Sequence, residues 1–220
     1  ASVSVLLNRE GALTPGGSVP AGGGAERTVL ADLDGDGLPE LVVPTFMEGT
    51  LHVFQNDGGG AFAPRSTILL GSRQHIPAAG DVDGDGDLDL VVTSSGSGEV
   101  YVLENGPSGG LEPVPVGLLW ETPWAAVVAD LNGDGIADIA VAEYSGHRVT
   151  ILEGDGGGGF TPLDGLSVGQ QPHQIVVADF DGDGRADLAT ANDADTFLTL
   201  LLSTGYDVGS DDSFPRPKRR

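Results

Sequence analysis

One acidic nine-residue sequence occurs four times in this chain, at a constant interval of 49 residues. The copies are DLDGDGLPE (32–40), DVDGDGDLD (81–89), DLNGDGIAD (130–138) and DFDGDGRAD (179–187). A constant interval of this size means that one structural unit is used repeatedly along the chain. The fold must therefore be an array of similar units, each with an acidic loop at the same place.

Oxygen-bearing side chains stand at positions 1, 3, 5 and 9 of every copy, and a short loop points such alternate side chains inward around an ion. Position 7 has no common side chain, so we expect its backbone carbonyl to serve as a ligand there. The predicted side-chain ligands are Asp32, Asp34, Asp36 and Glu40; Asp81, Asp83, Asp85 and Asp89; Asp130, Asn132, Asp134 and Asp138; and Asp179, Asp181, Asp183 and Asp187. The position 7 residues are Leu38, Asp87, Ile136 and Arg185.

The chemistry of these loops indicates a hard cation. Glycine fills positions 4 and 6 of every copy, as a chain that curls tightly around an ion requires. The chain has no cysteine and no loop contains histidine, which disfavours zinc, copper and iron. Many flexible oxygen ligands suit calcium better than magnesium. The sequence thus predicts about four bound calcium ions (Ca2+) rather than four acidic turns without metal.

Composition excludes several classes of function. The chain has 33 acidic and 10 basic residues, with a formal net charge of −23, which argues against binding to nucleic acid. It contains no run of 18 apolar residues, so we expect no membrane span. Calcium loops of modest affinity fill with calcium outside the cell, where its concentration is high. We therefore expect an extracellular or periplasmic protein. The start at Ala1 without a signal peptide suits a processed or excised segment.

Short apolar runs follow one another in a fixed order around each loop. Before the second loop comes 76–80, after it come 88–93 and 100–104, and a weaker run covers 111–119. The other copies have the same order, with first runs at 28–31, 125–129 and 175–178, second runs at 40–44, 138–142 and 187–191, third runs at 51–55, 149–153 and 197–202, and fourth runs at 63–70 and 160–168. Four short strands in a unit of this length are typical of a propeller blade.

The pattern VLADLDGDGLPELVV followed by GTLHVFQNDGGGAF resembles the FG-GAP, or VCBS, repeat, which builds the β-propeller of integrin α-subunit heads. The resemblance extends from about Ser2 to Leu202. It implies an all-β propeller with calcium loops between the first and second strands of each blade. The four loops and the partial units at the ends of this chain predict about four to five four-stranded blades. We accordingly predict a propeller domain over 1–205 and a disordered, acidic-then-basic tail over 206–220.

The ends of the chain leave the number of blades open. The first residues, SVSVLLNREGALTPGGSV, match the third and fourth strands of a unit, and the last unit stops after its third strand. The run 12–19 could supply the missing fourth strand and close a ring. A four-bladed ring, an irregular five-bladed ring, a homo-oligomer that completes a ring and a segment of a longer propeller all fit this pattern.

A ligand site is predicted on the face opposite the loops, where the units differ from one another. The residues six positions before the loops are Glu26, His75, Trp124 and His173, and the turns after the second strands include Phe46–Glu48 and Glu143–Tyr144. Trp124, with Glu143, Tyr144 and His75 or His173, could form a platform for a sugar or a peptide. In the alternative interpretation Trp124 fills the propeller axis, and the two histidines are structural or hold a transition metal.

These features together predict a non-enzymatic binding or adhesion module for a glycan or protein partner. The chain has no GxSxG motif, no cysteine and no Walker loop, so the common nucleophile and phosphate-binding motifs are absent. One alternative is a polysaccharide lyase that uses His75, His173 and Arg148. Another is an architectural part of a larger or oligomeric propeller.

Overall fold

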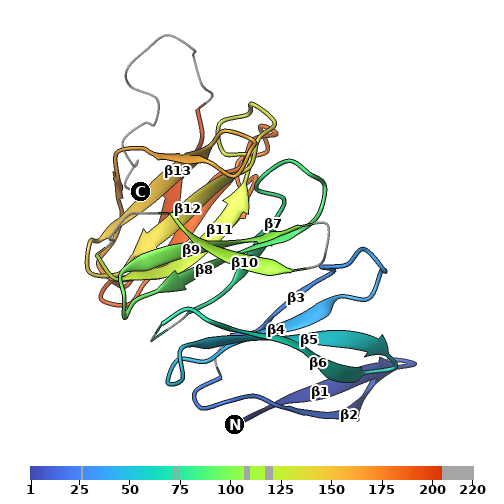
Figure 1. Ribbon diagram of the computed structural model, residues 1–220. Helices are drawn as coiled ribbons and strands as arrows, with labels where there is room; N and C mark the ends of the chain where they lie inside the picture. The colour runs from blue at the N-terminus through green and yellow to red at the C-terminus, as the bar shows by residue number, and fades with distance from the viewer. Residues whose placement is uncertain (26, 72, 74, 107–109, 117–120, 205–220) are drawn as a thin grey trace.

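The computed structural model describes residues 1–25, 27–71, 73, 75–106, 110–116 and 121–204. These residues form eighteen β-strands in five antiparallel sheets, which follow one another in chain order from the N-terminal sheet to the C-terminal one (Figure 1). None of the described segments is a helix of the length and hydropathy needed to cross a membrane. The all-β prediction is confirmed.

We number the sheets I to V in chain order. Sheet I contains β1 (Ser2–Arg9) and β2 (Ala12–Pro20). Sheet II contains β3 (Val29–Ala31), β4 (Glu40–Pro44), β5 (Thr50–Gly58) and β6 (Ala61–Leu69), and sheet III contains β7 (Ala78–Gly80), β8 (Asp89–Ser94), β9 (Glu99–Asn105) and β10 (Leu111–Pro115). Sheet IV contains β11 (Pro123–Ala129), β12 (Asp138–Glu143), β13 (Arg148–Gly154), β14 (Phe160–Pro162) and β15 (Leu166–Ser167), and sheet V contains β16 (Pro172–Ala178), β17 (Asp187–Asn192) and β18 (Leu198–Leu201).

Each of sheets II to V is a meander in which consecutive strands pair side by side, and the acidic loop joins its first strand to its second. This is the predicted blade. The run 160–168, predicted as one strand, is instead split into β14 and β15, which both pair with β13. Pro162 lies at the break, where a residue without an N–H cannot continue the ladder.

Side chains that alternate along each strand bury both faces of the inner sheets. In sheet III, Val91 packs against sheet IV, whereas Leu90 and Val92 pack against sheet II. We call the side turned to the following sheet the forward face and the side turned to the preceding sheet the backward face. Val42 and Ala140, 49 residues before and after Val91, also lie on forward faces, and all three are fully buried. The repeat in sequence is thus a repeat of inter-sheet contacts.

The five sheets form an open arc rather than a closed ring. Four apolar clusters fill the four spaces between consecutive sheets. Among the described strands, neither β1 nor β2 packs against β16, β17 or β18, and sheet I lies at the opposite end of the arc from the C-terminal strands (Figure 1).

The run 12–19 forms most of β2 and pairs with β1 instead of completing sheet V. Closure of the ring by this run is therefore wrong. The reason is local, because β1 and β2 are joined by a two-residue turn at Glu10 and Gly11, both with positive φ, which favours a tight hairpin. Asn8 Oδ1 also accepts the N–H of Gly11 at 3.0 Å.

Candidate metal loops and the opposite face

In the first acidic loop the side chains fold back onto the backbone of the same loop. Asp34 Oδ1 accepts the N–H of Asp36 at 3.3 Å, and Asp36 Oδ1 accepts the N–H of Leu38 at 2.7 Å. Asp32 Oδ2 accepts the N–H of Gly37 at 2.9 Å, and this glycine has a φ of 86°. The other three loops have the corresponding bonds. Each loop is therefore wound around its own carboxylates.

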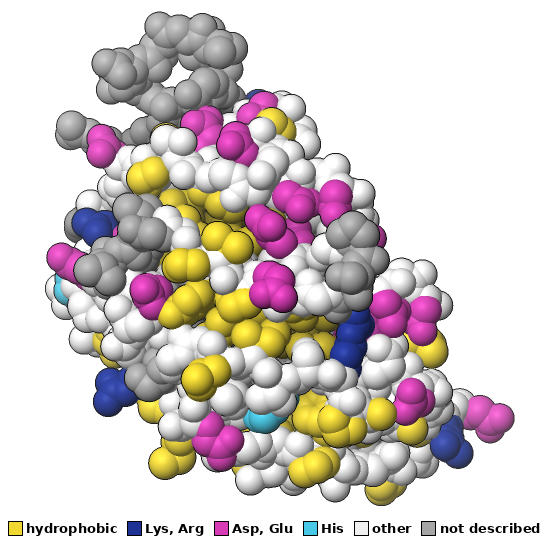
Figure 2. Space-filling model, viewed as in Figure 1, with side chains coloured by type: hydrophobic (Ala, Val, Ile, Leu, Met, Phe, Trp, Pro, Cys, Tyr) yellow, Lys and Arg dark blue, Asp and Glu magenta, His cyan; other side chains and the backbone are white. Residues whose placement is uncertain are grey.

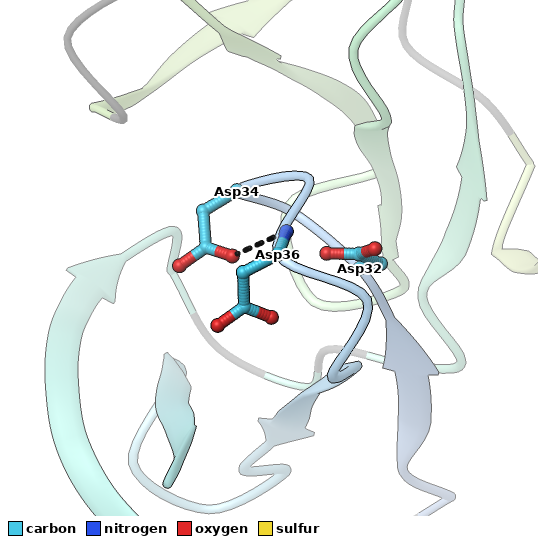
Figure 3. Close-up of side chains that lie close together, drawn as sticks. All are labelled: Asp32, Asp34 and Asp36. Carbon is cyan, nitrogen blue, oxygen red and sulfur yellow. Dashed lines mark hydrogen bonds between the residues drawn. The ribbon is translucent and has the colours of Figure 1, made fainter.

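The carboxylate oxygens of three loops converge closely enough to share one ion. Figure 3 shows this convergence for the first loop, where three acidic side chains come from one turn. The ligand atoms of each group lie within 4.8 Å of one another, and the groups are Asp32, Asp34 and Asp36; Asp81, Asp83 and Asp85; and Asp179, Asp181 and Asp187. In the third loop Asn132 stands among the acids, and its Oδ1 accepts the N–H of Asp134 at 2.9 Å.

One oxygen of the first loop fits a cation particularly well. Asp32 Oδ1 is buried and has no hydrogen-bond partner. A buried carboxylate oxygen without a donor is costly unless a positive charge compensates it. The donor set is all oxygen, which is the set that hard divalent cations prefer. The residues present therefore fit a metal ion of this class.

The residue at position 9 has a second role, because it ties each loop to the third strand of its sheet. In the third loop Asp138 is 1% exposed and accepts the N–H of Leu131 at 3.0 Å and that of Gly154 at 3.0 Å. Glu40, Asp89 and Asp187 make equivalent pairs of bonds to the backbone. The residue at position 9 is thus a structural anchor, or pivot, that fixes the loop to the third strand, as well as a candidate ligand.

The electrostatics of the loops separate buried from exposed acids. Burial raises the pKa of Asp89 and of Asp138 above the usual value, although backbone N–H donors act in the opposite direction. At the exposed Asp179, backbone N–H donors, led by that of Gly184, lower the pKa of the carboxyl. The mutual repulsion of the loop acids contributes to the raised values, as Asp83 and Asp85 do for Asp89.

The four loops differ in the side chains that compete for their acids. In the first loop Gln55 donates to Asp34 Oδ2 at 2.8 Å, and Arg65 lies 3.7 Å from the same oxygen. In the fourth loop Arg185 forms an ion pair with Asp183 and donates to the carbonyl of Ser203 at 3.3 Å. The pairing holds the Asp183 carboxylate with Arg185, and Asp187 takes its place among the converging ligands there.

Aromatic and imidazole rings from several sheets meet at the face opposite the loops. His75 stacks on Trp124 with ring centroids 4.1 Å apart, and Trp124 lies 4.9 Å from both Tyr144 and His173. Phe46 contacts the other side of the group, 5.7 Å from His75. The structure thus brings together four of the five residues predicted for a ligand face. We call Phe46, His75, Trp124, Tyr144 and His173 the ring cluster.

Two arginines adjoin this cluster. Arg27 donates to Gln174 Oε1 and lies 3.1 Å from His173 Nδ1, and the Cζ atom of Arg73 lies 5.8 Å from the centre of the Phe46 ring. Burial, with smaller electrostatic contributions from His173, Arg27 and Arg73, lowers the pKa of His75 to about 4. Neither arginine forms an ion pair with a described carboxylate. On the face drawn in Figure 2, acidic side chains are more frequent than basic ones.

Glu143 lies apart from this contact network. Its side chain is fully buried, accepts bonds from Arg148 Nε at 2.8 Å and Nη2 at 2.9 Å, and also bonds Thr150. The sequence prediction did not include the two arginines beside the ring cluster, although Arg27 directly follows Glu26, which was predicted. Glu26 and the 206–220 tail lie outside the described residues.

Comparisons with known proteins agree with this architecture. The profile of the FG-GAP-like repeat matches residues 32–92, 81–141 and 130–190, and that of the FG-GAP repeat matches 172–210. These matches together span more than half of the chain. A search of curated proteins found no match to the sequence.

Solved structures with the same fold are distant in sequence. A protein from Lactobacillus plantarum is 16% identical with a TM-score of 0.66, and the match covers 94% of this chain and 61% of that one. BBS1N, solved in complex with ARL6DN, is 18% identical with TM-scores of 0.57 and 0.52 in two structures. Those two matches cover 78% and 75% of this chain and 53% and 50% of the other. This chain therefore spans less than two thirds of the length of each of these proteins.

Proposed function

Because this chain belongs to the FG-GAP repeat family, with its acidic loops in tandem on a propeller, we propose that it is a calcium-stabilised, non-enzymatic binding module. Its proposed location is extracellular or periplasmic, where free calcium is high enough to fill loops of modest affinity. The observation that carries the calcium part is the convergence of acidic oxygens in the loops, with Asp32 Oδ1 buried and without a donor.

Calcium in these loops would relieve the repulsion between their acids and link the first two strands of each blade. The proposed ligands are the residues at positions 1, 3, 5 and 9, together with the backbone carbonyl at position 7. A site whose dissociation constant is one hundredfold below the free calcium concentration would add about 2.7 kcal/mol to the free energy of unfolding. Four such sites would add roughly 11 kcal/mol, which is comparable to the whole stability of a typical domain, about 5–15 kcal/mol.

Calorimetric titration of the metal-stripped protein tests this part. We expect about four calcium ions per chain, and one fewer in Asp183→Ala, with the other three loops still filled. Asp164→Ala, which removes an exposed acid outside the loops, is the matched control and should keep the full number. Four equal sites in Asp183→Ala would show that the ligand assignment is wrong.

The proposed recognition site is the ring cluster, with a glycan or a protein as the partner. It is supported by the gathering of aromatic, imidazole and guanidinium groups at one place on an otherwise acidic protein. Aromatic rings with polar tips are common in such sites because they offer apolar area and hydrogen bonds together. Arg148, a candidate for lyase chemistry, is held by Glu143 instead, so we propose binding without turnover.

A glycan and surface-protein binding screen in calcium tests the recognition site. We expect a partner whose affinity falls at least tenfold in Trp124→Ala, while the number of bound calcium ions stays the same. Phe197→Ala, which removes a 57% exposed ring directly before β18, is the control and should bind as the unaltered chain does. Equal binding by both variants would place recognition elsewhere on the molecule.

A further inference from the structure

The forward face of sheet V is exposed although it has the apolar residues of an inter-sheet contact. Val176, Phe180, Leu198 and Leu200 are 45%, 46%, 71% and 43% exposed. The residues 49 positions earlier in sheet IV belong to the cluster against sheet V, and three of them are Leu131, Val149 and Ile151, at 3%, 0% and 2% exposure. By its place in the repeat, this face is half of an inter-sheet contact.

The backward face of sheet I is the other half. Leu6 stands two residues before Asn8, as Phe54 stands two residues before Asn56 at the same place in sheet II. Phe54 is 4% exposed in the cluster between sheets I and II, whereas Leu6 is 60% exposed. Leu13 pairs with Asn8 across the hairpin and is 69% exposed. In sheets III to V the corresponding residues are Leu103, Leu152 and Leu201, which are 0%, 0% and 7% exposed.

We propose that the forward face of sheet V packs on the backward face of sheet I of a second copy of this chain. Every contact between consecutive sheets joins a forward face to a backward face, and these two faces are the unpaired members of that series among the described residues. The intermolecular contact would continue the internal series with the same polarity. A contact between two forward faces has no counterpart in the molecule.

This contact is heterologous, because it joins different surfaces of the two copies. Such head-to-tail contacts close into a ring when the rotation allows it and otherwise extend into a filament. Sheet I and the C-terminal strands lie at opposite ends of the open arc (Figure 1), so each copy offers one face to each of two neighbouring copies. This contact between copies would not depend on the identity of any ligand bound at the ring cluster.

Sedimentation velocity in saturating calcium tests the proposal with two single-face variants. The unaltered chain should show a mass above the 22.3 kDa of one copy, increasing with concentration. Leu198→Asp and Leu6→Asp, which each alter one face, should weaken association at least a hundredfold and sediment as monomers. When the two variants are mixed, each still offers one intact face, so they should form a one-to-one dimer.

Several results would overturn the proposal. An unaltered chain that stays monomeric when its concentration is raised 100-fold would do so. That result would mean that the two faces stay bare, or that additional polypeptide covers them in a longer protein. Dimerisation of Leu6→Asp alone would show a contact between two forward faces. Leu69→Asp, at a 75% exposed leucine on β6, is the control and should associate normally. Thermal melts check that each variant is folded. A calcium titration checks that each variant still binds calcium, so that a loss of association is not confused with a loss of the proposed calcium sites.

Discussion

The two ends of the innermost strands β3, β7, β11 and β16 follow different rules. At the end that enters the acidic loops, four copies keep the same ligand positions and the same backbone bonds. At the other end, the residues at or next to one repeat position are Arg27, His75, Trp124 and His173. The residues at the repeated end are those that every blade needs. The varied end is free to carry a site that occurs once.

The loop end also contains its own contrast between pivot and ligand. Asp138 is buried and holds two backbone N–H groups, whereas Asp134 is exposed and bonds only within its loop. Both are proposed calcium ligands. Substitution of either residue should therefore remove one bound calcium ion, but the two variants should differ in their free energy of unfolding.

The largest expected effect separates these two roles. Asp138→Ala leaves the N–H groups of Leu131 and Gly154 without their acceptor, and each unpaired buried donor costs about 1–3 kcal/mol. In saturating calcium, Asp138→Ala should therefore lower the free energy of unfolding by roughly 4 kcal/mol more than Asp134→Ala does. Urea denaturation measures both variants, and equal losses would remove the pivot role of position 9.

Much of the loop end was predictable from sequence because each rule there acts locally. Alternate acids, paired glycines and a fixed interval led to the loops, their place between the first two strands and the blade order. The pivot role of Asp138 was not predictable, because it depends on the third strand, which brings the N–H of Gly154 to a carboxylate 16 residues away in the chain.

The next largest effect concerns the opposite end and its dependence on pH. His75 has a pKa of about 4 in the folded chain, against 6.5 for an unperturbed histidine. Its neutral form is therefore the one that suits the fold, so its contribution is complete above pH 6.5 and declines as the pH falls toward 4. The difference corresponds to about 3 kcal/mol over that range.

Unfolding measured from pH 7 to pH 4 in saturating calcium, with the unaltered chain and His75→Gln, checks this expectation. Titration of the acids is common to both, so the difference between the two curves reports His75. The unaltered chain should lose stability more steeply as the medium becomes acidic. Parallel curves would mean that His75 is not the buried neutral group described.

A smaller effect distinguishes the loops from one another. Arg185 pairs with Asp183 in the fourth loop, so a cation must displace the guanidinium from one of its ligands. Arg185→Gln should tighten calcium binding in that loop by about tenfold, or about 1.4 kcal/mol. A calcium titration that resolves the affinity of each loop measures this change. Arg9→Gln, a substitution in the distant β1–β2 hairpin, is the control. A weaker fourth site in Arg185→Gln would show that the arginine assists the loop.

The opposite end was only partly predictable. The gathering of His75, Trp124, Tyr144 and His173 followed from their common place in the blade. Sequence alone did not show that Arg27 reaches His173 on another sheet, 146 residues away. Nor did it show that Glu143 turns to Arg148, its cross-strand partner in sheet IV, because the direction that each side chain takes is set only once the strands are packed.

The dependence of the unfolding free energy on free calcium tests the central claim most directly. When all sites are filled, each contributes about 1.4 kcal/mol per tenfold rise in free calcium, so four sites should give roughly 5–6 kcal/mol per tenfold. We predict that slope with calcium and a much smaller one with magnesium. A free energy of unfolding that stays constant from chelator to millimolar calcium would contradict the account.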